Sequence, residues 1–299
     1  MFRLAHISDP HLANVPVPTI RQLASKRITG YVNWKRNRVR ALFGDTLANL
    51  EGDIKAANVD HIAVTGDLVN LSLDEEFAAA RIWLETLGTH GDVGVVPGNH
   101  DAYVPGALAK ARKHWDGYIQ GDETPGKHAF PWLRRRGAVA LIGVSSAIAT
   151  APFLATGKFG NSQGKRLAAM LDRARAERLF RVVLIHHPPV RDAAPSHKRL
   201  YGIGRFGKIM AAHGAELVLH GHTHLPQRHH LPGATGPVPV IGVPAASQAA
   251  GGHKPAAAWN LFEIDGESGA WSCTLTERGI AGATGQIAVR SRMVLHGGG

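Results

Sequence analysis

Short apolar runs rich in β-branched residues alternate along the chain with segments whose apolar residues recur at helical spacing. The short runs are typical of buried strands, and the spaced segments are typical of helices. Strands are predicted at 2–8, 60–65, 93–96, 138–144, 181–185, 216–219, 238–243, 257–264 and 270–276, and helices at 34–57, 74–87 and 162–178. We expect the last three strands to be antiparallel. The alternation therefore predicts an α/β protein with a mixed sheet.

A chain of 299 residues is long enough to bury a large core, and no linker or repeat divides it. We therefore expect a single domain over residues 1–280. The segment after about residue 280 ends in three glycines. We expect 281–299 to be a flexible tail.

Composition is that of a soluble globular protein, with 44% hydrophobic and 19% charged residues. The single cysteine, Cys273, cannot form an internal disulfide, and neither a secretory signal nor a membrane-spanning apolar stretch is present. A cytoplasmic location is expected. The excess of 34 Lys and Arg over 23 Asp and Glu, a formal charge of +11, favours anionic partners.

Polar, ionisable or amide side chains follow five of the predicted strands. They are Asp9 and His11, Asp67 and Asn70, Asn99 with His100 and Asp101, His186 and His187, and His222 and His224. Any one such group would be an ordinary turn residue or helix cap. Ligands of α/β sheets bind outside the carboxyl ends of strands, so the joint occurrence predicts one shared site.

The chemistry of these side chains favours metal binding. Imidazole, carboxylate and amide ligands without a thiolate select hard-to-borderline ions such as Mn²⁺, Fe, Zn²⁺ or Ni²⁺. Two such divalent ions can hold a phosphate and ionise a water molecule near neutral pH. The sequence therefore predicts phosphoester hydrolysis by direct attack of water.

Five sequence blocks at these strand ends, DPH, GDLVN, GNHD, HHPP and GHTH, occur in the usual order of one known superfamily. Over residues 2–245 the chain resembles the calcineurin-like metallophosphoesterases. The resemblance implies a four-layer αββα sandwich with two mixed β-sheets. It also implies that residues 1–280 form one metallophosphoesterase domain, interrupted by a basic insertion at about 14–43.

The resemblance also implies a role for each residue of the blocks. Asp9, His11 and His224 would bind the first metal ion; Asn99, His186 and His222 would bind the second; and Asp67 would bridge them. His100 would protonate the leaving group, with Asp101 orienting its ring. His187 is an alternative to His186 as the ligand. Asn70 either forms a hydrogen bond that stabilises the position of the bridging carboxylate or is only a turn residue.

The insertion carries seven basic residues and no acid between Asn14 and Phe43. They are Arg21, Lys26, Arg27, Lys35, Arg36, Arg38 and Arg40. Interleaved apolar and aromatic residues suit an acidic lipid surface or a bulky anionic substrate, although a solvated helix with a buried apolar stripe is equally compatible. The stretch SKRITGYVNWKRNR resembles an insertion in enzymes that cleave UDP-diacylglucosamine. The HHPP and GNHD blocks equally resemble class III cyclic-nucleotide phosphodiesterases and glycerophosphodiesterases.

These observations predict a phosphodiesterase or pyrophosphatase whose substrate is a nucleotide, a glycerophosphodiester or a nucleotide-lipid. UDP-2,3-diacylglucosamine pyrophosphohydrolase, acting in lipid A synthesis, is the specific alternative. With that lipid substrate we also expect the protein to contact the inner face of the membrane peripherally. A scaffold that has lost catalysis is the alternative of another class, but the complete ligand set argues against it. No specific nucleic-acid partner is expected, because no recognition helix or base-stacking motif is present.

Overall fold

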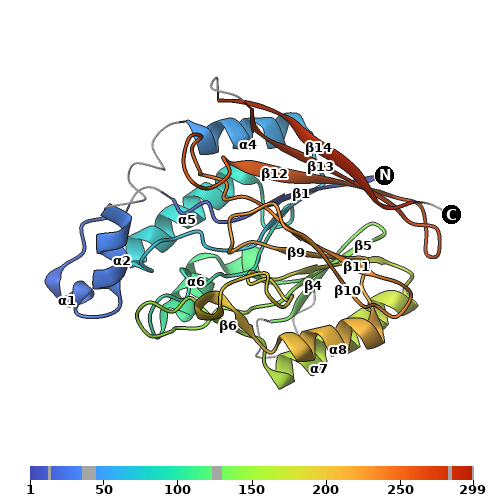
Figure 1. Cartoon of the computed structure of the whole chain (residues 1–299), viewed down its shortest axis with the longest axis horizontal. Helices are drawn as coiled ribbons and strands as arrows, with labels where there is room; N and C mark the ends of the chain where they lie inside the picture. Colours follow the sequence, from blue (N-terminus) through green and yellow to red (C-terminus); the bar gives the residue numbers. More distant parts are fainter. Residues whose placement is uncertain (13–14, 36–44, 123–129, 282–284, 298–299) are drawn as a thin grey trace.

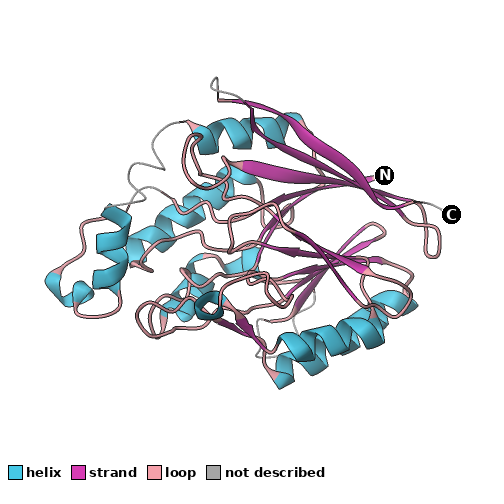
Figure 2. Cartoon of the chain, in the orientation of Figure 1, coloured by secondary structure: helices cyan, strands magenta, loops and turns pink. Residues whose placement is uncertain are grey.

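The computed structural model describes residues 1–12, 15–35, 45–122, 130–281 and 285–297 (Figure 1). Within these residues, two large mixed sheets lie face to face, and helices cover their outer faces (Figure 2). This four-layer αββα sandwich confirms the predicted fold class. No helix in the described part of the chain is both long and apolar enough to cross a bilayer.

The first sheet has the strand order β14-β13-β12-β1-β2-β3. Its strands are β1 (Phe2–Ile7), β2 (His61–Val64), β3 (Val93–Val95), β12 (Ala258–Asp265), β13 (Ser272–Ala281) and β14 (Gln286–His296). β1, β2 and β3 are parallel, whereas β12, β13 and β14 are each antiparallel to their neighbours. The carboxyl ends of β1, β2 and β3 therefore lie at one edge.

The second sheet has the order β10-β11-β9-β7-β5-β4. Its strands are β4 (Trp132–Arg136), β5 (Val139–Gly143), β7 (Phe180–Leu184), β9 (Leu217–His220), β10 (Arg228–Leu231) and β11 (Val238–Gly242). The central strands β5, β7, β9 and β11 are parallel to one another. Two further short strands, β6 (Gly157–Lys158) and β8 (Leu200–Tyr201), pair separately.

The described residues contain seven α-helices, of which the last five bury apolar side chains and the first two bury none. They are α1 (Ile20–Leu23), α2 (Arg27–Asn33), α4 (Thr46–Ala56), α5 (Asp74–Leu87), α6 (Ala107–His114), α7 (Asn161–Ala176) and α8 (Ile203–His213). In α5, Phe77, Ala80 and Leu84 recur at helical spacing and join the larger core, which also lines the first sheet. In α7, Leu167 and Leu171 pack into a second core beneath the other sheet.

Residues 286–296 correct the prediction of a flexible tail over 281–299. They form β14, which pairs antiparallel with β13 over most of its length. Ile287, Met293 and Leu295 of this strand pack against the larger core. Burial of these side chains offsets the entropy of ordering the segment, and the three terminal glycines concealed that pattern.

The helix predicted over 34–57 is found as α4 from Thr46 onward, and residues 36–44 of that prediction lie outside the described residues. One further prediction needs correction. The strand predicted at 238–243 is not purely antiparallel, because β11 is parallel to β9 and antiparallel only to β10. The helices α6 and α8 and the strands β4 and β10 were not predicted.

Candidate metal centre

The predicted site residues follow the carboxyl ends of β1, β2 and β3 in one sheet and of β7 and β9 in the other. Asp9, His11, Asp67, His222 and His224 adopt φ angles of 53°, 39°, 57°, 68° and 58°. Positive φ is costly for residues with a side chain, and it clusters where function requires a particular geometry. The sharp turns direct side chains from both sheets into one buried cluster.

Asp9, His11 and His224 form the first group of this cluster. Their nearest ligand atoms all lie within 4.8 Å of one another. His224 Nε2 is 3.0 Å from Asp9 Oδ1, and His11 Nε2 is 3.8 Å from the same oxygen. This is the set expected from the sequence to hold the first ion, and its spacing could accommodate one.

Asp67 connects this group to a second one. Its Oδ2 atom lies 3.9 Å from His11 Nε2 and 3.4 Å from His186 Nε2. His186 Nε2 is in turn 3.3 Å from Asn99 Oδ1. His186 and His222 belong to a further group of possible ligands together with His187. The structure thus places Asp67 between the two predicted ligand sets.

A backbone carbonyl fixes which nitrogen His186 presents to the cluster. The Nδ1 atom of His186 lies 2.6 Å from the carbonyl oxygen of Thr65. A carbonyl only accepts hydrogen bonds, so Nδ1 carries a proton and Nε2 is the nitrogen that faces Asp67 and Asn99. Histidines that ligate metals are usually held in this way. The donor set fits a borderline divalent ion.

His187 is engaged by the protein through both ring nitrogens. Ser146 Oγ lies 2.7 Å from its Nδ1, and the carbonyl oxygen of Ala155 lies 3.2 Å from its Nε2. Burial, followed by the charge of His186, lowers the pKa of His187 to about 3. A neutral ring with both nitrogens occupied has no lone pair left for a metal ion. The contacts therefore favour His186 over His187 as the ligand.

The two buried carboxylates are held ionised by the surrounding imidazoles. Burial alone would raise the pKa of Asp67, but the charges of His186 and His100 hold it well below its usual range. Burial would likewise raise the pKa of Asp9, and the charge of His224 and its hydrogen bond outweigh this effect. Both residues are thus available as anionic ligands.

His100 lies beside the cluster, but its orientation corrects the predicted role of Asp101. His100 Nδ1 is 2.6 Å from the carbonyl oxygen of Asn70 rather than from the Asp101 carboxylate. Asp101 instead accepts hydrogen bonds from the backbone N–H groups of Gly98, Asp67, Leu68 and Val69 at 2.8 to 3.2 Å. It joins the loops after β2 and β3, and does not orient the imidazole.

Glu76 is a second buried carboxylate of this kind that the sequence did not indicate. It accepts hydrogen bonds from the N–H groups of Asn70, Leu71 and Leu73, and so holds the turn that carries the partner of His100. In the sequence Glu76 stands beside two acids that are exposed at the start of α5. Their spacing does not distinguish the buried acid from its exposed neighbours.

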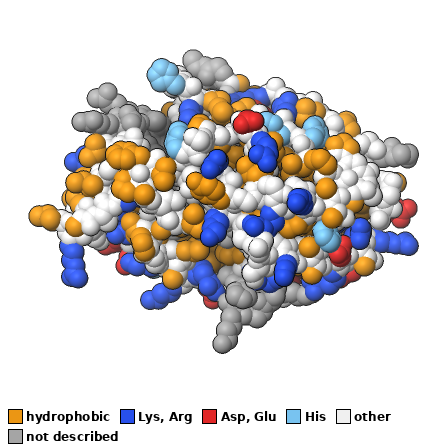
Figure 3. Space-filling model, turned by 60° about the horizontal axis from the view of Figure 1, so that its bottom comes forward, with side chains coloured by type: hydrophobic (Ala, Val, Ile, Leu, Met, Phe, Trp, Pro, Cys, Tyr) orange, Lys and Arg blue, Asp and Glu red, His pale blue; other side chains and the backbone are white. Residues whose placement is uncertain are grey.

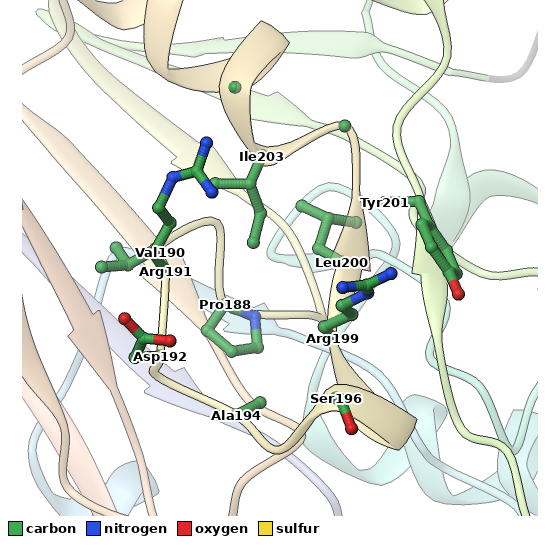
Figure 4. A pocket seen from close by; sticks show the side chains of 12 residues that line it. Pro188, Val190, Arg191, Asp192, Ala194, Ser196, Arg199, Leu200, Tyr201 and Ile203 are labelled. Atoms are coloured by element: carbon green, nitrogen blue, oxygen red, sulfur yellow. The ribbon is translucent and has the colours of Figure 1, made fainter.

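A pocket of about 420 Å³ is lined by residues between 188 and 204, in the segment that follows His187. Arg191 and Arg199 project from opposite sides of it in Figure 4, and Leu200 and Ile203 form part of its apolar wall. The same segment contacts the site, because His222 Nε2 lies 2.9 Å from the carbonyl oxygen of Lys198. The two guanidinium groups outweigh the single carboxylate of Asp192 in the lining, so the charge of this pocket favours an anionic substituent.

We expect replacement of Gly98 by alanine to disrupt the centre. An added Cβ would lie 2.7 Å from the Asp67 nitrogen and 2.7 Å from His186 Cε1, both too close for a real contact. Misplacing these groups by even an ångström should lower the hydrolysis rate about 10²-fold and weaken metal binding. Metal titration and steady-state kinetics would measure both.

Gly52 on α4 provides the control, since a Cβ there meets nothing within 4 Å. Gly52→Ala should leave activity unchanged and raise helix stability by up to about 1 kcal/mol. Wild-type activity of Gly98→Ala would contradict the close packing around Asp67.

Comparison with known proteins bears on the fold and on the family. No curated protein matches the sequence. A dimetal phosphatase from Danio rerio superposes with a TM-score of 0.62 at 12% identity, covering 99% of this chain and 98% of that one. The purple acid phosphatase PPD1 from yellow lupin superposes with a TM-score of 0.58 at 11% identity, covering 96% of this chain and 52% of that one. These likenesses concern the fold.

The sequence itself matches the family described as calcineurin-like phosphoesterase over residues 2–226, which is most of the chain. The five blocks and their convergence on one buried cluster are consistent with this match. The chain belongs to the calcineurin-like phosphoesterase family.

Proposed function

We propose that the protein is a dinuclear metal-dependent phosphoesterase that hydrolyses a phosphodiester or a pyrophosphate. The observation that carries this proposal is the convergence of Asp9, Asp67 and four histidines from two sheets on one buried cluster. Asp9, His11 and His224 would hold one divalent ion, and Asn99, His186 and His222 the other. Asp67 would contribute to both.

When bound, such an ion pair supplies an ionised water and neutralises phosphate charge. The protein's own part is to hold the anionic ligands and to supply a proton. Asn70 O accepts the Nδ1 proton of His100, so we assign proton donation to the Nε2 atom of His100. A protonated Nε2 could give its proton to the departing oxygen. Arg191 and Arg199 would attract an anionic substituent of the phosphoester, on either side of the bond that is cleaved.

A lipid-linked pyrophosphate such as UDP-2,3-diacylglucosamine is the second candidate substrate, favoured by the surface of the insertion. Val17, Ile20 and Ile28 are 86%, 89% and 53% exposed, and Phe153 of a neighbouring loop is 83% exposed. Figure 3 shows hydrophobic side chains gathered at its left end, which α1 and α2 occupy in Figure 1. Exposed apolar residues next to basic ones suit acyl chains or a membrane surface.

The test is to incubate Mn²⁺-loaded protein with cyclic AMP, a glycerophosphodiester or detergent-dispersed UDP-diacylglucosamine, and to identify products by mass spectrometry. Cleavage of one substrate that stops on adding a chelator and returns with Mn²⁺ is the expected result. It would also identify the substrate class. Turnover that persists after complete metal removal would exclude the proposed chemistry.

If none of the three is cleaved while two ions remain bound, the scaffold alternative is favoured instead. A membrane contact has its own measurement, sedimentation with vesicles that contain anionic lipid. Removing the exposed side chains with Ile20→Ser and Val17→Ser should reduce that sedimentation without changing cleavage of a small water-soluble diester.

A further inference from the structure

His100 is held in place by contacts on two sides. Its Nδ1 atom is 2.6 Å from Asn70 O, and its ring is stacked on Tyr103 with centroids 5.3 Å apart and planes 9° from parallel. Ser72 Oγ also donates a hydrogen bond of 2.6 Å to the carbonyl oxygen of His100. The position of the imidazole therefore depends on the turn over residues 70–73 and on Tyr103.

The turn over residues 70–73 is strained and is held from both sides. Ser72 has a φ of 57°, which is unfavourable for serine. On one side, the Glu76 carboxylate accepts hydrogen bonds from the backbone N–H groups of the turn. On the other, the guanidinium group of Arg27 donates from Nε to Leu71 O at 2.8 Å and from its terminal nitrogen to Ser72 O at 2.7 Å. Only a planar fork reaches both carbonyls at once.

The insertion holds Tyr103 as well. The ammonium group of Lys26 lies 4.5 Å above the centre of the Tyr103 ring. Gly30 of α2 packs so closely that an added Cβ would lie only 2.5 Å from the Tyr103 hydroxyl oxygen. Both supports of His100 are thus backed by residues of the segment from Lys26 to Gly30.

We propose that Arg27 is a positioning residue for His100, and that the insertion thereby belongs to the catalytic apparatus in addition to bordering the site. The inference rests on the proposed function, because it requires His100 to donate a proton. Arg27 itself acts through the carbonyls of Leu71 and Ser72 and need not touch the substrate. Loss of Arg27 should therefore impair proton donation and leave the metal ligands intact.

The experiment compares Arg27→Gln with wild type on a series of aryl methyl phosphodiesters, whose leaving phenols range from 4-nitrophenol to unsubstituted phenol. Each protein is loaded with Mn²⁺, and its metal content is measured. For 4-nitrophenol, which leaves without a proton, kcat should stay within about twofold. For phenol it should fall about 10- to 100-fold with little change in KM, the usual effect of losing a supporting residue.

Three further variants separate positioning from other roles. Arg27→Lys keeps the charge but lacks the fork, so it should behave like Arg27→Gln. Gly30→Ala, which presses on Tyr103 without removing a charge, should show the same leaving-group dependence. Arg290→Gln is the matched control, because Arg290 is also a half-buried arginine that donates to two backbone carbonyls, those of Ile280 and Ala256, far from the site.

A double-mutant cycle decides the matter. In a His100→Ala background, Arg27→Gln should cause no further loss, because the group it positions is already gone. An equal loss across all leaving groups, full activity of Arg27→Lys, or additive losses in the double variant would each overturn the inference. Failure of the wild type on every substrate, including the three used to test the proposed function, would overturn that function, whereas an unchanged leaving-group dependence in Arg27→Gln would overturn this inference alone.

Discussion

Replacing Asp67 with asparagine should remove most bound metal and lower phosphodiester hydrolysis by about 10³-fold or more. Asp67 lies between the two ligand groups, 3.4 Å from His186 and 3.9 Å from His11. An amide at this position keeps the shape of the side chain but loses the negative charge that would hold both metal ions. The two metal ions together would stabilise the transition state by several kcal/mol. Elemental analysis of the purified variant and steady-state kinetics measure the two effects.

Asparagine is preferred to alanine because the backbone here is unusual. Asp67 has a φ of 57°, which asparagine tolerates, and its Oδ1 accepts the N–H of His100 at 2.7 Å, which an amide oxygen can also do. Asp172→Asn, on the half-exposed surface of α7, controls for the loss of one negative charge. Normal metal content and activity in Asp67→Asn would show that Asp67 is not a shared ligand.

The position of the site could be predicted from sequence because strand ends are marked by local chemistry. Short apolar runs identify strands, and Asp9, Asp67 and His186 each follow one closely. Parallel strands bring their carboxyl ends to one edge, so local assignments suffice to converge these residues. That two different sheets contribute to the cluster came from the family resemblance, since no local pattern distinguishes one sheet from two.

The contacts that support the cluster could not be predicted in the same way. The family resemblance implied that Asp101, which adjoins His100 in the chain, orients the imidazole. In the structure its carboxylate instead accepts the N–H groups of two separate loops. Which buried acceptor a donor reaches depends on tertiary packing, and neighbouring sequence positions do not encode it. The roles of Glu76 and Arg27 escaped prediction for the same reason.

The C-terminal strand illustrates a different limit. β14 has partly buried residues in an irregular order, and a bulge shifts its register against β13 between Glu277 and Arg278. A bulge breaks strict alternation, which is the signal by which a strand is recognised.

Replacing His100 with alanine should leave both metal ions bound while turnover falls about 10²- to 10⁴-fold on substrates with poor leaving groups. Its Nδ1 proton is directed to Asn70 O, so we assign Nε2 as the atom that protonates the departing oxygen. An activated diester that releases 4-nitrophenol needs no proton and should be cleaved at nearly the wild-type rate. Metal analysis together with kinetics on both substrates tests this, and His230→Gln, an exposed histidine on β10, is the control.

The structure also allows a rival role for His100, that of a metal ligand. His11, Asp67 and His100 have ligand atoms within 4.8 Å of one another, so His100 could itself be a metal ligand. In that case His100→Ala would lose metal, and activity would fall equally on both diesters. Retained metal with a selective loss on the poor leaving group is expected only of a proton donor, because a missing ligand weakens the attack of water on every substrate.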